Sequence, residues 1–174
     1  FKQYEHVIDD LMRQKAHVLS KAEESVMAQI GEVTSATNVV FTMFNNADIK
    51  FGSIIDEDGD DVEVTHGRYS GFMESYNRRV RREAFEHMYE AYINFKNTLA
   101  ANYNYNTKTD VVTARIRKYS SARDAALSGD NIPLKVYDNL IDTVNGKLGL
   151  MHRYMEIRRK MLQVDELHMY DMYV

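Results

Sequence analysis

The sequence has 174 residues, enough for one domain, and its 22 Lys and Arg and 26 Asp and Glu give a formal net charge of −4. This balance argues against a nucleic-acid-binding protein or one held on an anionic membrane. The chain has no Cys, which excludes disulfides and thiolate zinc sites, and no apolar run approaches the ~20 residues of a membrane span.

The way the chain begins predicts a cytoplasmic fragment. It opens on Phe1, with no apolar segment typical of a signal peptide behind it. A start without Met indicates an internal or trimmed piece of a longer protein. The lack of Cys is also typical of a reducing compartment.

Residues 1–47 predict an N-terminal helical subdomain of three helices. The first has an apolar stripe at helical spacing, formed by Tyr4, Val7, Ile8, Leu11 and Met12. The second begins at Ser20, where Glu23 completes a capping box, and we expect it to stop at Gly31. The third is the segment "SATNVVFTMFNNA", which should end at Asn45 and Asn46.

Residues 48–72 predict a β-hairpin, at about 53–64, followed by a short helix. Its strands are Ser53–Ile55 and Val62–Val64, and Asp58-Gly59 is the turn signal. The acidic tip, Asp56–Asp61, suggests calcium binding as an alternative. An EF-hand needs Gly at position 6 of a loop between helices, whereas Gly59 is at position 4 between strands, so we favour a solvated hairpin tip.

Residues 73–174 predict a long-helix region. Asn77 is a suitable N-cap, and a helix of ~40 residues and roughly 60 Å should run from Arg78 to about Tyr119. A short helix from Ser121 to Gly129 follows, and Pro133 opens a last long helix. The predicted fold class is therefore mainly α: a long-helix bundle with one small β-hairpin.

The last helix carries two apolar stripes, so it should need partners on two sides. The first stripe is Val136, Leu140, Val144, Leu148, Met151 and Met155. The second is Ile141, Leu150, Tyr154, Ile157 and Met161. We expect Gly146 and Gly149 to allow close approach of another helix, and one partner to lie outside this chain.

Four groups of residues invite a chemical interpretation, but none has the spacing of a known site. The "RRVRR" segment, Arg78–Arg82, should pair with the hairpin tip or with the acidic pair of the second helix rather than bind nucleic acid. His152 and Glu156 stand at i and i+4, which suits zinc, but a surface hydrogen bond between them is favoured. His87 has no second His at i+4.

The third and fourth groups are tyrosines and the chain's tail. Tyr103–Asn106, with Tyr92 and Tyr119, could line a peptide channel, although half-buried packing is favoured. The tail "DELHMYDMYV" holds Glu166, His168 and Asp171, which are metal-ligand and acid/base residue types without a zinc signature. No H-E-x-x-H, G-x-S-x-G, Walker or G-x-G-x-x-G motif occurs. We therefore assign no catalytic or metal-binding residue, and the substrate-binding residues stay unknown.

Several long segments together resemble a known family. They are "ADIKF", "VTHGRYSGFMES", "NRRVRREAFEHMYEAYINFKNTLAA", "ARIRKYSSARDAAL", "NIPLKVYDNLIDTV", "LMHRYMEIRRKML" and "DELHMYDMYV". In this order they resemble bacterial oligoendopeptidase F, within the thimet-oligopeptidase-like zinc metallopeptidases. The resemblance runs from about Tyr4 to Val174 and covers the family's N-terminal region.

The resemblance implies a non-catalytic N-terminal lobe of a cytoplasmic zinc metalloendopeptidase that hydrolyses short oligopeptides. Long helices would wall the substrate channel, and Asp165–Val174 would connect to a catalytic lobe that this chain lacks. The zinc and its H-E-x-x-H motif belong to the full-length enzyme, so the chain alone should be an inactive hydrolase fragment. Its partners would be short peptides, its own missing lobe and, through exposed apolar surface, a second copy. A stand-alone helical protein-interaction module is the alternative.

Overall fold

A computed structural model describes residues 2–174, which are mainly α-helical and carry one small β-hairpin, as predicted. The chain forms two compact units, each built from two segments. Unit 1 runs from the N-terminus to Thr42 and from Ala100 to Ile141, and unit 2 comprises Met43–Leu99 and Asp142–Val174. The division into 1–47, 48–72 and 73–174 follows sequence order and stays a prediction.

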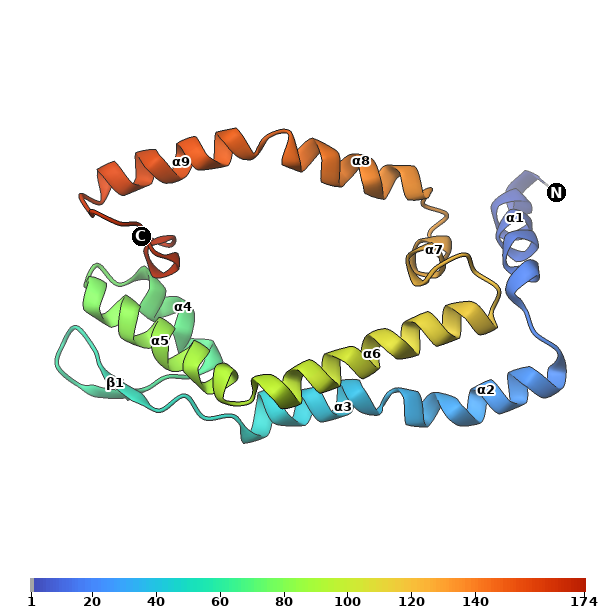
Figure 1. The fold of residues 1–174 in the computed structure, drawn as a ribbon, viewed down its shortest axis with the longest axis horizontal. Helices are drawn as coiled ribbons and strands as arrows, with labels where there is room; N and C mark the ends of the chain where they lie inside the picture. The colour runs from blue at the N-terminus through green and yellow to red at the C-terminus, as the bar shows by residue number, and fades with distance from the viewer. Residues whose placement is uncertain (1) are drawn as a thin grey trace. The chain divides into compact units, whose positions relative to one another are not determined.

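Unit 1 contains α1, α2, α3, α7, most of α6 and the first part of α8 (Figure 1). Their bounds are Glu5–Gln14, Lys21–Thr34, Ala36–Met43, Ala122–Ser128, Lys96–Ile116 and Leu134–Asn145, in that order. One-turn 3-10 helices flank α1 at Lys2–Tyr4 and Lys15–His17.

The predicted capping box at the start of α2 is confirmed. The Ser20 hydroxyl accepts the N–H of Glu23, and the Ser20 N–H donates to the Glu23 carboxylate over 2.8 Å. These hydrogen bonds also lower the pKa of Glu23. The predicted stop at Gly31 is wrong, because α2 continues to Thr34 and Gly31 does not adopt the positive φ of a helix-ending glycine.

Helix α6 holds unit 1 together through polar contacts at two places. Near its start, Asn102 Nδ2 donates to Thr37 O and Thr37 Oγ1 donates to Asn106 Oδ1, each over 3.1 Å, which fixes α3 along α6. Near its end, the Arg117 guanidinium binds both carboxylate oxygens of Glu24 at 3.0 Å. Among the residues described for unit 1, Ala114 alone is fully buried, so polar contacts rather than a deep core join these helices.

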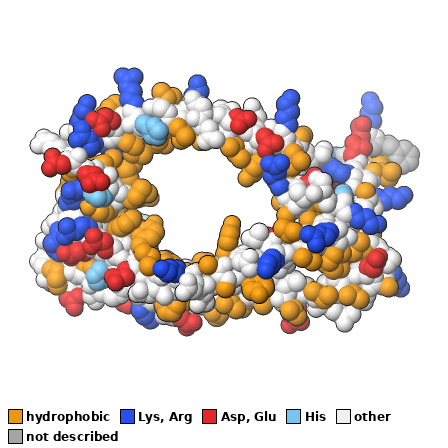
Figure 2. Space-filling view, in the orientation of Figure 1, with side chains coloured by type: hydrophobic (Ala, Val, Ile, Leu, Met, Phe, Trp, Pro, Cys, Tyr) orange, Lys and Arg blue, Asp and Glu red, His pale blue; other side chains and the backbone are white. Residues whose placement is uncertain are grey.

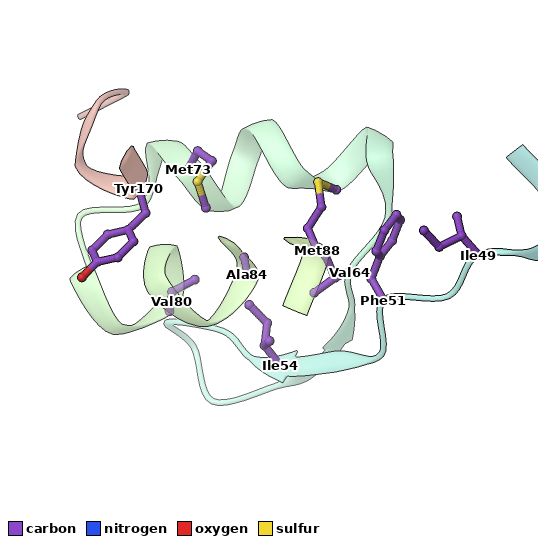
Figure 3. Close-up of a cluster of buried hydrophobic side chains, with 9 residues drawn as sticks. All are labelled: Ile49, Phe51, Ile54, Val64, Met73, Val80, Ala84, Met88 and Tyr170. Carbon is purple, nitrogen blue, oxygen red and sulfur yellow. The ribbon is translucent and has the colours of Figure 1, made fainter. Parts of the chain in front are cut away.

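Unit 2 contains the hydrophobic core. Strands β1 (Ser53–Ile55) and β2 (Asp61–Glu63) pair antiparallel with Ile54 opposite Val62, beside α4 (His66–Glu74) and α5 (Arg78–Asn94). Figure 3 shows the buried cluster that these elements and the last turn of the chain build together. Its members are Ile49, Phe51, Ile54, Val64, Met73, Val80, Ala84, Met88 and Tyr170.

The predicted 40-residue helix is wrong, because the chain breaks at Phe95 between α5 and α6. Phe95 has φ −106° and ψ 14°, and its N–H donates to Tyr92 O three residues earlier, over 3.0 Å. The Phe95 ring packs edge-on against Phe44, with ring centroids 5.0 Å apart. No Pro or Gly lies at the break. The ring that packs against Phe95 belongs to Phe44, which is far away in the sequence.

The predicted single last helix is also two helices, α8 and α9 (Leu148–Met161), separated at Gly146 and Lys147. A Cβ at Gly146 would lie 3.2 Å from Asp142 O of its own helix, and one at Gly149 would meet nothing within 4 Å. No helix within residues 2–174 approaches these glycines, and Gly146 serves a tight helix end. Close approach of a helix from outside this chain stays a prediction. None of the helices within residues 2–174 combines the length and hydrophobicity that a membrane span requires.

Candidate functional site

Asp171, one of the three tail residues noted in the sequence, is the centre of a buried ion-pair network. It ends a 3-10 turn, Met169–Asp171, and its side chain is 0% exposed. Arg78 binds both carboxylate oxygens, at 3.1 and 2.9 Å, and Arg81 Nη2 donates to Oδ1 over 2.8 Å. The backbone N–H of His168 donates to Oδ2 over 3.0 Å. The carboxylate is thus fully engaged by donors from α5 and from its own turn.

Arg81 is itself buried, and backbone carbonyls take up its remaining donors. Its guanidinium donates to the carbonyls of Ser75, Tyr76 and Tyr170, over 2.7, 3.2 and 3.0 Å. One side chain therefore joins the loop before α5 to the last turn of the chain. From α9, Arg158 donates to the backbone carbonyls of Asp171 and Val174.

The surroundings of Asp171 keep it ionised. Burial alone would raise the pKa of its carboxyl, but the hydrogen bonds from Arg78, Arg81 and the His168 N–H outweigh burial and lower that pKa to about 2. The same pairing raises the pKa of Arg78. A carboxylate held this way has neither a proton to exchange nor an oxygen free for a metal, so its role is structural.

The other two tail residues do not join Asp171 in a catalytic arrangement. The His168 ring stacks on Tyr170, with ring centroids 4.9 Å apart, and the Arg78 guanidinium lies 5.4 Å from the same tyrosine ring. Glu166 projects into solvent, with its carboxylate 3.8 Å from His168 Nε2. The turn thus directs Asp171 toward the arginines and His168 along Tyr170.

The arginines of "RRVRR" do not pair as predicted. Arg79 donates to the Glu83 carboxylate over 2.7 Å and to the backbone carbonyls of Ile55 and Asp56, so it reaches the hairpin but not its acidic side chains. Arg82 lies 4.0 Å from Glu86. The acidic pair of α2 instead supplies Glu24 to Arg117, which lowers the pKa of that carboxyl.

The acidic hairpin tip uses its carboxylates to hold the turn. Asp56 Oδ1 accepts the N–H groups of Asp58 and Asp60, over 2.9 and 3.0 Å, and Gly59 has φ +94°. Glu57 accepts the Ser75 hydroxyl over 2.6 Å. Across residues 2–174, no cluster of three or more His, Asp or Glu is arranged to hold a metal ion.

The predicted hydrogen bond between His152 and Glu156 is wrong. Glu156 is bound by Arg159 at 2.8 Å and lies 3.7 Å from Lys160, and these cations lower its pKa. His87 makes a 3.0 Å hydrogen bond from Nδ1 to the carbonyl of Phe51, so it fixes the segment before β1.

The tyrosines divide into two groups. The half-buried packing expected of them holds for Tyr92, whose hydroxyl donates to Asn45 Oδ1 over 2.6 Å, and for Tyr119, which stacks on His17 at 3.5 Å. It is wrong for Tyr103 and Tyr105, which are 74% and 61% exposed. These two offer aromatic area and hydroxyl groups on the surface of unit 1.

Both apolar stripes of α8 and α9 lie on the surface. In the first stripe, the side chains from Val136 to Met151 are 42–60% exposed and Met155 is half-buried. In the second, exposure ranges from 43% at Ile141 to 76% at Met161. Figure 2 shows hydrophobic side chains gathered along α9. Exposed apolar area of this extent is typical of an interaction surface.

A further apolar surface lies in unit 1, where α2 and α6 form a groove of about 420 Å³. Met27, Ile30, Val112 and Ile116 contribute to its lining.

Sequence reasoning missed Arg78, Arg81 and Arg158 as partners of the tail. Arg78 and Asp171 are 93 residues apart, and no local spacing connects them. The sequence offers one signal: Arg79 and Arg82 each have a Glu four residues later, whereas Arg78 and Arg81 have none.

Comparisons with known proteins identify the family. The model of peptidase family M3 matches residues 71–174, and a model described as oligopeptidase F matches residues 1–51. Oligopeptidase PepF of Bacillus subtilis is 46% identical over 99% of this chain, and the plasmid-encoded oligoendopeptidase F of Lactococcus lactis subsp. cremoris is 41% identical over 99%. The chain spans only 26% and 29% of the length of these two relatives.

Solved structures give the same result. The crystal structure of oligoendopeptidase-F from Enterococcus faecium matches 99% of this chain with a TM-score of 0.95 and 44% identity, over 34% of its own length. A crystal structure of a peptidase from Chlamydophila abortus matches 98% with a TM-score of 0.93 and 28% identity, over 29% of its length. The chain therefore belongs to peptidase family M3.

Proposed function

We propose that this chain is the non-catalytic N-terminal helical lobe of a zinc metalloendopeptidase that hydrolyses short oligopeptides, and that it walls the substrate channel. The observation that carries the proposal is the exposure of both stripes of α8 and α9 in a chain that spans 26–29% of its relatives' length. The names of those relatives, oligopeptidase and oligoendopeptidase, supply the substrate class.

The role of the lobe is steric. Helices such as α6, with 21 residues, are stiff walls that exclude folded proteins while admitting flexible peptides. Exposed tyrosines such as Tyr103 and Tyr105 suit contacts with a peptide, because they combine area with a hydroxyl at low entropic cost.

The residues that the structure describes, 2–174, do not fit a zinc site. His152 and Glu156 stand at chelating spacing, but Glu156 is bound by Arg159 and Lys160 instead. The sequence has no H-E-x-x-H. We therefore propose that the zinc of the full-length enzyme is held by residues outside this chain, and we assign no catalytic step to the residues present.

Partners and location follow from the same proposal. The catalytic lobe of the same polypeptide would cover the α8 and α9 stripes, and short peptides would be the substrate. We propose a cytoplasmic enzyme, supported by the absence of Cys. Within the sequence, 1–47 and 48–72 would form the N-terminal subdomain and the hairpin region, and 73–174 would lead toward the catalytic lobe.

The test compares this chain with a longer polypeptide that carries it together with a downstream H-E-x-x-H segment. With zinc and a quenched fluorescent peptide, the longer polypeptide should cleave and the 174-residue chain should not. Chelator-sensitive cleavage by the 174-residue chain alone would contradict the proposal.

The exposed stripes also fit a second function, a stand-alone helical module that binds a partner helix along Val136–Met161. The gene sequence decides between the two. A stop codon directly after Val174 favours the module, and a downstream H-E-x-x-H favours the peptidase lobe.

A further inference from the structure

A π-helix, Phe44–Asp48, begins unit 2 and sets the position of an asparagine. Ile49 N donates to Phe44 O over 2.9 Å, which closes the wider turn, and the buried Ile49 then enters the core. Asn45, within the wide turn, accepts the Tyr92 hydroxyl at Oδ1 over 2.6 Å. Its Nδ2 donates to Asn46 Oδ1 over 2.8 Å.

This arrangement fixes the tautomer of His66. Its Nε2 lies 2.8 Å from the Tyr92 oxygen. The single hydroxyl proton of Tyr92 is used on Asn45, so His66 Nε2 must donate the proton of this second hydrogen bond. In the neutral imidazole, Nδ1 is then an acceptor, and it has no hydrogen-bond partner among residues 2–174.

Opposite charges flank the same place. A cavity of about 130 Å³ is lined by Asn46, Lys50, Glu63 and His66, together with Asn45, Thr65 and the core residues Ile49, Phe51 and Val64. Lys50 precedes β1 and Glu63 ends β2. Within residues 2–174, neither side chain forms an ion pair or a hydrogen bond, although both border one cavity. The lining of this cavity therefore includes one cationic and one anionic residue that do not pair with each other.

We propose that this cavity binds a small free α-amino acid as its zwitterion. The ligand's carboxylate would meet Lys50 and the amide N–H groups of Asn46, and its ammonium would meet Glu63 and His66 Nδ1. The volume equals about four water molecules, which suits glycine or alanine rather than a large side chain. The site goes beyond the proposed peptidase role and does not depend on it.

The direct test is an NMR titration of the 174-residue chain with glycine and L-alanine. Saturable shifts of the backbone amides of Asn46, Lys50 and Glu63 are expected, with a Kd of about 1 mM because the charges are exposed. Glycinamide lacks the carboxylate and N-acetylglycine lacks the ammonium, so each should bind about fivefold more weakly. Equal binding of either half-ligand, or no saturable shift, overturns the proposal.

Substitutions locate the site. Lys50→Met and Glu63→Gln should each raise the Kd for glycine about fivefold. Lys96→Met and Glu74→Gln make the same chemical changes at exposed side chains that form no ion pair or hydrogen bond within residues 2–174, and they should leave the Kd for glycine unchanged. If both pairs of variants behave alike, the shifts are non-specific and the site is wrong.

The position of the proton on the His66 ring provides a separate test. Ring ¹⁵N shifts of His66 should report a proton on Nε2 in the native chain, and glycine should move the Nδ1 resonance. Tyr92→Phe and Asn45→Ala should both weaken this tautomer preference. A proton on Nδ1 in the native chain contradicts the arrangement.

Discussion

At the scale of single residues, Asp171 connects the end of the chain to α5. It is fully buried, and it balances Arg81, which is 3% exposed. Removing one member of a buried pair leaves the other charge without compensation, which costs far more than losing an exposed pair. The neighbouring Arg79–Glu83 pair is partly exposed, so we expect it to contribute little.

Asp171→Asn should therefore lower the free energy of unfolding by about 3 kcal/mol, because Arg81 stays buried without its counter-charge. Urea denaturation followed by circular dichroism measures the change. Asp165→Asn, at an exposed side chain in the same tail, is the matched control and should stay within about 0.5 kcal/mol of the native chain. Equal stabilities of the two variants would show that the network does not stabilise the fold.

The low pKa of Asp171 also predicts acid sensitivity. Its folded pKa is about 2, below the ~3.9 of an unfolded Asp, so the unfolded chain binds the proton more readily. The stabilisation is complete above about pH 4, and it is lost as the pH falls from there toward 2. The free energy of unfolding should fall by about 2 kcal/mol over this interval. Urea midpoints at several pH values measure it, and the stability gap between the native chain and Asp171→Asn should narrow over the same interval.

At the scale of elements, most helix starts were predictable and most helix breaks were not. Ser20, Asn77 and Ser121 each accept a backbone N–H at the predicted cap, because capping depends on neighbours two or three residues apart. The break at Phe95 depends on Phe44, about fifty positions away, and no local signal encodes it.

Substitution by Ala should have opposite effects on stability at Gly59, in the hairpin turn, and at Gly71, in a helix. Gly59 has φ +94°, so Gly59→Ala should destabilise the chain by about 1–2 kcal/mol through backbone strain. Gly71 lies in α4 with open space around the position of a Cβ, so Gly71→Ala should stabilise it by about 0.5–1 kcal/mol. Thermal denaturation of both variants measures the two signs, and the same sign for both would contradict the assigned turn.

At the scale of the whole molecule, the two compact units differ in how they bury apolar surface. Unit 2 has the clustered core of Figure 3, whereas unit 1 buries little beyond Ala114 and leaves the α2–α6 groove open. Exposed apolar surface of this kind favours association with whatever can cover it.

The chain alone should consequently self-associate as its concentration rises. Sedimentation velocity across a concentration series measures this. Replacing Leu150 and Met161, which are 66% and 76% exposed, together by Gln should shift the association to higher concentration. Replacing the exposed polar Asn97 and Thr98 by Gln is the control and should not. A monomer at every concentration would contradict the prediction.

The sequence by itself determined the fold class, the hairpin and the family resemblance. The fold class and the hairpin depend on local patterns: helical periodicity, caps within one turn, and an Asp-Gly turn between β-branched runs. The resemblance depends instead on several long segments in a fixed order. It also identified α8 and α9 as helices with apolar surface to cover, although it joined them into one.

Only the tertiary structure decided what the suggestive side chains do. Glu166, His168 and Asp171 share one short segment, but the turn at Met169–Asp171 sends the carboxylate to Arg78 and Arg81 and the imidazole along Tyr170. Ion pairs and ring contacts between residues some 90 positions apart leave no trace in local spacing, because their energy comes from the folded neighbourhood.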